Sequence, residues 1–352
     1  MAATPTAVTE ATPEAPRVYA VVLNWNGWPD TVACVESLLR QSHANLRVVI
    51  CDNASGDDSV SRIRQWAAGE LDVLPPAHAD CRRCAFPPVA KPVPLTELSR
   101  RAAEAEGPSA PGGGVVLIHT GANLGYAGGN NVGLRYARRR GDADFVWILN
   151  NDLVARPDAL RALVDRMAGD PGAGLCGATL RDYRDPARIQ ARGGARYNAW
   201  FGTHRAIGAG ETGSGPTRAE VEAAMSYVIG ASMFASAAWL QEVGLMNEDY
   251  FLYYEEIDWS VRGGGRFRLA YAPECTVYHK EGESTGRPER RPTTDYLALA
   301  NRLRFTRRHR PWALPTVWLG FLAVLMNRAR RGQYERLMPI LGIMFGRGRG
   351  AA

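Results

Sequence analysis

Short apolar segments, each followed by polar residues, constrain the fold of this chain more than any other feature. The first four lie at residues 18–23, 46–51, 115–119 and 145–149. Continuous apolar runs of this length are typical of strands that are buried on both faces of a parallel sheet. Helical patterns separate them, one beginning at Pro29 and two more at about 129–140 and 157–168. The alternation predicts an α/β fold with a Rossmann-like, mostly parallel sheet flanked by helices.

The polar residues that follow these strands are the first candidates for a binding site. In open α/β sheets, ligands bind in the crevice beyond the carboxyl ends of the strands. Nearly half of the 352 residues are hydrophobic, which suffices for a sizeable core. We therefore expect one α/β domain over residues 17–285, with its site at this edge of the sheet.

Two segments interrupt the alternation. Residues 75–114 are rich in Pro, Ala and Gly, which predicts an insertion that is largely a flexible loop with a short helix at about 95–105. Residues 181–226 are rich in Gly and Arg and predict a mobile flap beside the substrate site. Strands are expected to resume at residues 227–235, 266–272 and 275–279.

The two ends of the chain differ in character from this domain. Residues 1–16, mostly Ala, Thr, Pro and Glu, predict a disordered leader that lacks the features of a signal peptide. Residues 286–352 predict a basic, amphipathic, helical region, whose apolar stretches are shorter than the roughly 20 residues that span a bilayer. Two interpretations of residues 311–345 stay open: helices that lie on the inner face of a membrane or pack on a partner, and helices that pack on the domain itself.

Charge and cysteine content indicate which partners and which cellular compartment to expect. A net charge of +6 is modest for 352 residues and does not indicate binding to nucleic acid. The arginines cluster before the apolar C-terminal stretch, which favours an anionic membrane surface or a phosphate-bearing substrate as the partner. Six cysteines form no disulfide framework in a chain of this length, so we expect the cytoplasm. We interpret Cys81 and Cys84 as free thiols in a loop, because a zinc site needs two more ligands and only His78 is at hand.

Asp52 ends the second predicted strand. A buried carboxylate costs free energy unless it has a partner, and the N–H of a nucleobase at the crevice could supply one. The alternative is a cap on the helix that begins near Asp57. The residues alone leave both interpretations open.

A glycine-rich segment, residues 123–131, follows the third strand. Glycines let backbone approach a ligand closely, and a helix that starts at about residue 129 presents free N–H groups to an anion. A helix-capping turn is the alternative.

Asn150, Asn151 and Asp152 follow the fourth strand. Hard cations prefer oxygen ligands, so a carboxylate here can hold Mg²⁺ or Mn²⁺ against a diphosphate, although a turn is the other common use of Asn and Asp. A second ligand must come from elsewhere. His279 ends a late strand and is the candidate, with a structural histidine as the alternative.

Three carboxylates lie within four positions at Glu255, Glu256 and Asp258, among aromatic residues. At helical spacing, Glu255 and Asp258 share one side and Glu256 points elsewhere. Apolar neighbours raise the pKa of a carboxylic acid, which suits a general base. A solvated helix face is the alternative for an acidic run.

In this order, the segments resemble glycosyltransferase family 2, with its nucleotide-sugar-binding GT-A fold, and its rhamnosyltransferase-like branch in particular. The resemblance runs from about Val18 to Arg308. The segments that carry it are Val21-Val22-Leu23-Asn24-Trp25-Asn26-Gly27, Cys51-Asp52-Asn53-Ala54-Ser55, Asn123 to Asn131, Leu149-Asn150-Asn151-Asp152, Phe251 to Asp258 and Val277-Tyr278-His279.

The resemblance implies a role for each candidate residue. Asp52 contacts the base of the nucleotide, and Asp152 and His279 hold Mg²⁺ or Mn²⁺. Glu256 is the catalytic base, with Glu255, Asp258 and Arg262 as supporting residues. The remaining residues that line the nucleotide and sugar pocket are Asn24, Asn123, Gly125, Gly128, Asn130 and Asn151. Asn150 departs from the family, which has an acid at that position.

The implied activity is a metal-dependent, inverting transfer of a hexose, with rhamnose as the first expectation. The donor is a nucleoside-diphosphate sugar and the acceptor a glycan or a lipid-linked glycan in cell-surface polysaccharide synthesis. Two alternatives stay open: a nucleotidyltransferase or other nucleotide-dependent α/β enzyme, and a non-catalytic transferase-like scaffold. The absence of Gly-x-Gly-x-x-Gly after the first strand counts against a dinucleotide enzyme, whereas Asn150 keeps the scaffold open. The sequence does not indicate an oligomeric state.

Overall fold

The computed structural model describes residues 15–105, 114–280 and 291–346. The predicted leader therefore lies almost wholly outside the described residues, as do residues 106–113 of the predicted insertion.

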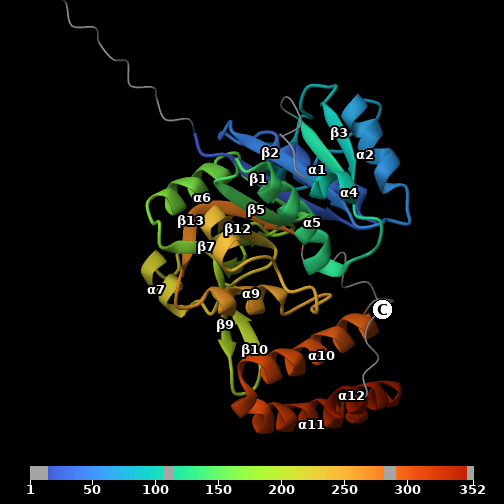
Figure 1. Cartoon of the computed structure of the whole chain (residues 1–352), viewed down its shortest axis with the longest axis vertical. Helices are drawn as coiled ribbons and strands as arrows, with labels where there is room; N and C mark the ends of the chain where they lie inside the picture. The colour runs from blue at the N-terminus through green and yellow to red at the C-terminus, as the bar shows by residue number, and fades with distance from the viewer. Residues whose placement is uncertain (1–14, 106–113, 281–290, 347–352) are drawn as a thin grey trace, which may run out of the picture.

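A ten-stranded mixed sheet forms the centre of the molecule (Figure 1). Its strands in spatial order are β3 (Leu95–Ser99), β4 (Val115–His119), β2 (Leu46–Asp52), β1 (Val18–Asn24), β5 (Phe145–Asn150), β12 (Ser232–Ser236), β7 (Ala173–Asp182), β13 (Arg268–His279) and β6 (Leu153–Ala155), and β8 (Ile189–Arg192) pairs with β7. The five strands from β3 to β5 are parallel, as are β7 and β13, whereas β12, β6 and β8 run antiparallel to their neighbours. The predicted α/β class, with a mostly parallel sheet, is confirmed.

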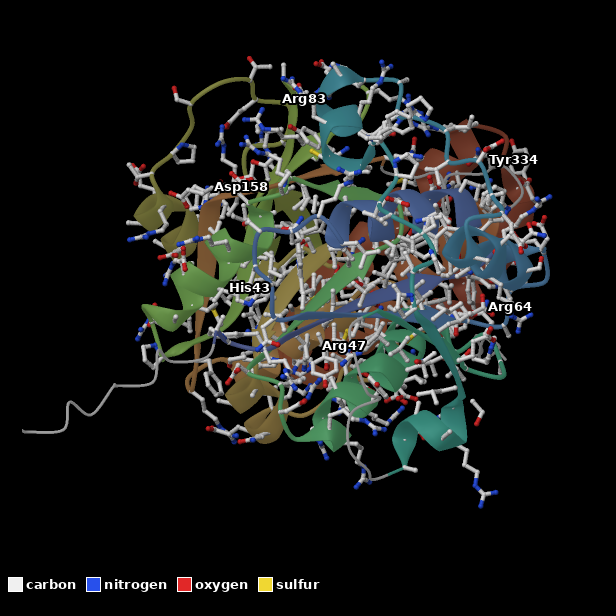
Figure 2. The ribbon with its side chains drawn as sticks, turned by 90° about the horizontal axis from the view of Figure 1, so that it is seen from above. His43, Arg47, Arg64, Arg83, Asp158 and Tyr334 are labelled. Atoms are coloured by element: carbon white, nitrogen blue, oxygen red, sulfur yellow. The ribbon has the colours of Figure 1, made fainter. Side chains whose placement is uncertain are left out.

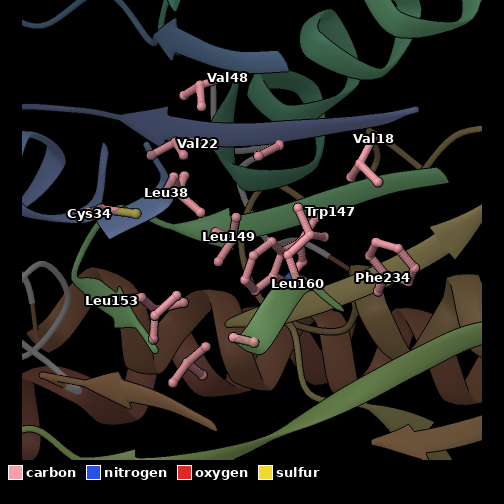
Figure 3. Packing of buried hydrophobic residues seen from close by; sticks show 14 of the residues in the cluster. Val18, Val22, Cys34, Leu38, Val48, Trp147, Leu149, Leu153, Leu160 and Phe234 are labelled. Atoms are coloured by element: carbon pink, nitrogen blue, oxygen red, sulfur yellow. The ribbon is translucent and has the colours of Figure 1, made fainter. Parts of the chain in front are cut away.

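Helices cover both faces of this sheet, because successive side chains of a strand point to opposite faces. Val18, Ala20 and Val22 of β1 pack in one core with α1 (Trp28–Leu38), α2 (Ser59–Ala68) and α6 (Ala159–Ala168). Figure 3 shows this core, in which Trp147 and Leu160 lie beside Phe234. Tyr19 and Val21 face the other core, which α5 (Gly125–Arg140), α8 (Ala237–Glu242) and α9 (Glu255–Gly263) complete.

The expectation of a largely flexible insertion is wrong for the described part of residues 75–114. This part contains α3 (Ala79–Ala85), the edge strand β3 and α4 (Arg100–Glu104), with Arg83 projecting from α3 at the rim of the molecule (Figure 2). The fully buried Glu36 of α1 holds it in place, because its carboxylate accepts hydrogen bonds from Val89 N (2.7 Å) and Lys91 Nζ (2.7 Å). Composition does not reveal a partner so far away in the sequence.

Residues 181–226 also contain more regular structure than their composition predicts. Strands β8 and β9 (Gly194–Asn198) follow β7, and β9 forms a small sheet with β10 (Thr203–Ala206) and β11 (Tyr227–Val228). Helix α7 (Arg218–Ala224) begins with a capping box of Thr217 and Glu220. The strand predicted at 227–235 is divided into β11 and β12, and the two predicted closing strands are one strand, β13, with an irregularity between Ala272 and Thr276.

Three helices form a C-terminal layer beside the sheet domain (Figure 1): α10 (Arg291–His309), α11 (Leu314–Arg330) and α12 (Leu337–Met344). Two 3₁₀ turns, Pro311–Ala313 and Tyr334–Arg336, connect them. The helices share an apolar core that includes Leu303, Phe321 and Ile340. In the described part of the chain, no helix combines the length and the hydropathy that a membrane span needs.

Within the C-terminal layer, packing on the domain is observed for α10, whereas contact with a membrane stays a prediction. Helix α10 packs on the domain, since Phe305 is fully buried against Tyr254 and Tyr227. Helix α11 instead exposes apolar side chains at helical spacing, with Leu319 at 61%, Leu322 at 47% and Met326 at 63% exposed.

Candidate active site

Strand order brings the polar ends of β1, β2 and β5 together. Strands β2 and β5 lie on opposite sides of β1 and run parallel to it, so Asn24, Asp52 and Asn150 end neighbouring strands at one edge. The order of the strands reverses at β1, which is where open α/β sheets form their binding crevice. The predicted position of the site therefore agrees with the topology.

Asp152 and His279 meet beside this edge although they are remote in sequence. Strand β6 pairs antiparallel with the end of β13, which sets His279 opposite Leu153. His279 Nε2 lies 3.3 Å from Asp152 Oδ1, and both side chains are mostly buried. The Oδ1 atom has no hydrogen-bond partner in the protein.

Gln190, which the sequence analysis missed, sets the orientation of His279. Its side-chain nitrogen donates to the backbone oxygen of His279 (3.0 Å), so its oxygen is the atom that faces His279 Nδ1 at 2.9 Å. The Nδ1 atom must then carry a hydrogen, which leaves the lone pair of Nε2 directed at Asp152. Two acceptors 3.3 Å apart repel each other unless a proton or a cation lies between them.

This arrangement fits a divalent cation with two protein ligands. A buried, unpaired carboxylate oxygen and an imidazole nitrogen oriented by an outer amide are typical of metal ligands. The described residues hold no group of three or more His, Cys, Asp or Glu side chains that could bind a metal. The remaining ligands would therefore come from a substrate diphosphate and water.

Asp52 is buried, and the protein itself satisfies most of its hydrogen-bonding capacity. Its carboxylate accepts from Asn24 Nδ2 (2.8 Å), from the Ser55 hydroxyl (2.6 Å) and from Ser55 N (3.2 Å). Asn24 is fully buried, and its Oδ1 accepts from the Thr31 hydroxyl. Asn24 therefore positions the Asp52 carboxylate and has no exposed surface for a nucleotide. This differs from our expectation that Asn24 lines the nucleotide pocket.

The anion site expected at a helix start near residue 129 is wrong, because α5 begins at Gly125. The first backbone N–H groups of this helix already have partners: Gly125 N donates to Asn123 Oδ1 (3.0 Å), and Tyr126 N donates to Phe251 O (2.7 Å). Gly125 has a φ of 70°, and an added Cβ would lie 2.2 Å from Phe251 O. A Cβ at Gly128 would lie 2.7 Å from Leu124 Cβ. Both glycines therefore allow close packing.

Two amide side chains at the edge likewise face protein atoms. Asn130 is fully buried, and its Nδ2 donates to Tyr126 O (3.0 Å). Asn151 Nδ2 donates to Gly27 O (3.1 Å) and to the Thr31 hydroxyl (3.0 Å). These contacts join the end of β5 to the start of α1, so both amides support the crevice. Asn123 is exposed, but its Oδ1 caps α5.

The acidic cluster lies at the start of α9, as its spacing predicts. Glu255 is buried and Glu256 is partly exposed. Burial, together with the charge of Glu256, raises the pKa of Glu255 well above its usual range, and burial raises the pKa of Glu256 to about 7. One carboxylate oxygen on each of them is buried without a hydrogen-bond partner. An unpaired carboxyl group with a pKa near neutrality is suited to taking up a proton.

Tyr126 links the acidic cluster to the Asp152 end of the site. Its hydroxyl donates to Gly230 O, and the side chain of Glu256 packs on the same glycine. Burial raises the pKa of Tyr126, and the charges of Glu255, Glu256 and Asp152 raise it further. The charges of carboxylates from the turn between β5 and β6 and from α9 therefore both act on the pKa of Tyr126.

Asp258 and Arg262 fix the position of α9 in the domain. The fully buried carboxylate of Asp258 accepts from Arg262 Nε (2.8 Å), and Arg262 also donates to the backbone oxygens of Val243 and Leu245. The sequence analysis missed a second partner of Asp258: His309 Nε2 lies 2.7 Å from the other carboxylate oxygen. The supporting role predicted for Asp258 and Arg262 is consistent with these contacts.

Helix α10 also contacts the segment that leads into α9. Asn301 Nδ2 donates to the backbone oxygens of Leu252 (2.9 Å) and Tyr253 (3.1 Å). Tyr253 and Tyr254 have φ values of 69° and 76°, a region that costs about 1–2 kcal/mol for residues with a side chain. We infer that Asn301 stabilises this backbone and so the position of Glu255 and Glu256.

The cysteine pair lies in a helix, whereas we expected a loop. Cys81 and Cys84 of α3 are buried beside Val154 and Tyr278, and burial raises their pKa values to about 12 and about 11. His78 caps the same helix through Nδ1, which accepts from Asp80 N (3.2 Å). All six cysteines are buried free thiols.

Comparison with known proteins places this geometry in a family. The sequence model of Glycosyl transferase family 2 matches residues 19–75 and 99–217, which is half of the chain. The N-acetylglucosaminyl-diphospho-decaprenol L-rhamnosyltransferase of Mycobacterium tuberculosis is 30% identical over 189 residues, which are 49% of this chain and 61% of that protein. The low-salt glycan biosynthesis hexosyltransferase Agl10 of Haloferax volcanii is 30% identical over 145 residues, or 41% of this chain and 45% of its own. The chain thus spans less than two thirds of either relative.

Solved structures are more distant. The mannosyltransferase PcManGT from Pyrobaculum calidifontis, in complex with GDP-Man and Mn²⁺, is 15% identical, with a TM-score of 0.48 over 95% of this chain and 88% of its own. The family match extends from the first strand across the glycine-rich segment and the Asp152 turn. This chain, with its GT-A type α/β domain, belongs to glycosyltransferase family 2.

Proposed function

We propose that this protein is an inverting glycosyltransferase that moves a hexose from a nucleoside-diphosphate donor to a lipid-linked glycan. The observation that carries the proposal is the arrangement around Tyr126: its hydroxyl donates to Gly230 O beside the side chain of Glu256, and the charges of Glu256 and Asp152 raise its pKa. A base near the acceptor and a carboxylate near the diphosphate are what an in-line displacement at an anomeric carbon needs. The mycobacterial relative, named as a rhamnosyltransferase that acts on a diphospho-decaprenol, supports rhamnose as the sugar and a polyprenyl diphosphate as the carrier.

In the proposed reaction, Glu256 takes the proton from an acceptor hydroxyl. The acceptor oxygen attacks the anomeric carbon opposite the leaving diphosphate, so one displacement inverts the configuration. Burial and the charge of Glu256 raise the pKa of Glu255 well above its usual range, so Glu255 holds its proton more tightly than a free carboxyl group does. The N-terminus of α9 stabilises a negative charge on Glu256.

Asp152 and His279 would hold Mg²⁺ or Mn²⁺, which neutralises charge on the departing diphosphate. Gln190 keeps His279 Nε2 free for this role. Asp52 is the proposed contact to the nucleobase, through the carboxylate oxygen that has only a long hydrogen bond to Ser55 N.

Replacing Glu256 with glutamine tests the base. The variant keeps the shape of the side chain but cannot accept a proton, so transfer should fall by about 10²–10⁴ while nucleoside diphosphate affinity stays within about twofold. The assay is a donor screen, with product detection across dTDP- and UDP-sugars in Mn²⁺. Glu274→Gln, an exposed glutamate on β13, is the matched control. Normal turnover by Glu256→Gln would show that another group takes the proton, and no turnover of any donor by the native protein would favour a scaffold.

We also propose that the exposed face of α11 contacts the cytoplasmic surface of a membrane. Leu319, Leu322 and Met326 form an apolar stripe, and Arg330 and Arg331 follow it at the exposed end of the helix. Such a face suits the boundary between headgroups and acyl chains of anionic lipid.

Cosedimentation with vesicles tests this contact. The Leu319→Glu and Leu322→Glu variants should lose binding to phosphatidylglycerol vesicles. Leu74→Glu, at a residue that is 84% exposed outside the C-terminal layer, should not lose it. Equal binding by all variants would remove the membrane contact from the proposal.

A further inference from the structure

A cavity lies where the C-terminal layer meets the sheet domain. Its volume is about 640 Å³, and its walls come from α10, from α12 and from the segment that precedes α9. None of the candidate residues in the crevice lines it. It is therefore a separate feature of the molecule, and it is large enough for a small-molecule ligand.

The walls of this cavity have two kinds of chemistry. Arg304, Arg307 and Arg308 of α10 line it and are exposed. The apolar part of the wall is formed by side chains that are mostly buried: Leu297 and Leu303 of α10 and Ile343 of α12. Guanidinium groups beside an apolar wall suit a ligand with a phosphate at one end and a hydrocarbon at the other.

The acidic residues at the cavity compensate only part of this positive charge. Among its described lining residues, Glu248 and Asp249 are the acids. Glu248 accepts from Asn131 (2.9 Å) and pairs with Arg135, which lies outside the cavity. Asp249 is 68% exposed and forms an ion pair with Arg308 at 3.6 Å. Among the described residues, the guanidinium of Arg307 donates one long hydrogen bond, to Met344 O at 3.4 Å.

The cavity adjoins the backbone that carries the proposed base. Phe251 lines it and also packs on Gly125 at the start of α5. Asn301 lines it too, and this residue binds the backbone oxygens of Leu252 and Tyr253 immediately before Glu255. A ligand held here would therefore lie against the segment that leads to Glu256.

We propose that this cavity binds the diphosphate and the first isoprene units of the lipid-linked acceptor. The inference rests on the proposed function, which it deepens by assigning the acceptor a place. The arginines would take the phosphate oxygens, and the apolar wall formed by Leu297, Leu303 and Ile343 would take the hydrocarbon. The sugar that the carrier bears would then extend toward Glu256.

Binding of farnesyl diphosphate to the full chain tests the proposal without any need for turnover. The measurement is calorimetry with Mn²⁺ and saturating dTDP or UDP, so that the donor site is already occupied. The native protein should bind farnesyl diphosphate, and should bind inorganic pyrophosphate and farnesol each at least about tenfold more weakly. Arg307→Gln and Arg308→Gln together should weaken farnesyl diphosphate binding about 100-fold while nucleotide affinity stays unchanged.

The matched control is the double variant Arg83→Gln and Arg161→Gln, which removes the same charge from exposed sites on α3 and α6. It should bind like the native protein. Equal loss in both double variants would mean that net charge alone attracts the ligand, and pyrophosphate binding as tight as farnesyl diphosphate would remove the lipid from the assignment. Either result overturns the proposal. A failed proposed function looks different, because no nucleotide sugar would then be turned over whatever the cavity binds.

Discussion

Replacing Gly125 with alanine tests whether the glycine-rich segment is built for packing or for contact with a ligand. In the structure, a Cβ at this position would lie 2.2 Å from Phe251 O and 2.7 Å from its ring. The left-handed backbone, with a φ of 70°, costs a residue with a side chain about 1–2 kcal/mol. Overpacking adds about 1–3 kcal/mol. We expect the free energy of unfolding to fall by about 2–5 kcal/mol.

Gly121→Ala is the control that separates the two costs. Gly121 also has a left-handed φ, 81°, but nothing lies within 4 Å of an added Cβ. The difference between the variants therefore isolates the contact with Phe251, at about 1–3 kcal/mol. With a urea m-value of about 3 kcal/mol/M, the midpoints of unfolding should differ by about 0.3–1 M.

The outcome that refutes this reasoning is specific. If both variants unfold at the same urea midpoint, the close approach of α5 to Phe251 is not what requires a glycine. If Gly125→Ala then also loses affinity for nucleoside diphosphate, the ligand contact implied by the family resemblance is restored. Titration with dTDP and UDP on the folded variants measures this second quantity.

Three further predictions concern the site. The transfer rate of the native protein should rise with pH through about 7 and then level off, because Glu256 must lose its proton to act as a base. A transfer rate that falls over this pH range would contradict the assignment of Glu256. His309→Ala should lower the free energy of unfolding by about 1–3 kcal/mol, because it leaves a buried oxygen of Asp258 without a donor. His309→Gln should recover most of this loss. Equal urea midpoints for the two variants would mean that the contact does not contribute to stability. Gln190→Leu should weaken Mn²⁺ binding about 10–100-fold, because the ring of His279 loses the hydrogen bond that orients it. Electron paramagnetic resonance measures the Mn²⁺ affinity, and an unchanged value would show that Gln190 does not orient His279.

The strands of the parallel half of the sheet were predictable because their signals are local. Four apolar runs were recognised within a residue of their observed ends, since strands buried on both faces require continuous hydrophobic residues. The polar residues at their ends, such as Asp52 and Asp152, follow from the same pattern. Polar side chains at these ends face the crevice because parallel strands end at one edge.

The three-dimensional structure decided how those residues are used. Gln190 lies in a segment whose composition predicts a mobile flap, and the pairing of β8 with β7 brings it to His279. His309 and Asn301 lie in a helix that the sequence marks only as basic, yet they contact Asp258 and the backbone before Glu255. Contacts between distant segments leave no periodic signal in the chain.

By itself, the sequence determined the class of sheet, the edge that carries the candidate site and the acidic cluster on α9, because each depends on a pattern of neighbouring residues. The structure decided that the glycine-rich segment packs against Phe251, that Asn24 positions the Asp52 carboxylate, and that α10 supports the segment before Glu255. These features depend on which surfaces meet when the chain closes on itself. Burial and hydrogen bonding at such meetings are properties of the folded molecule and not of any one segment.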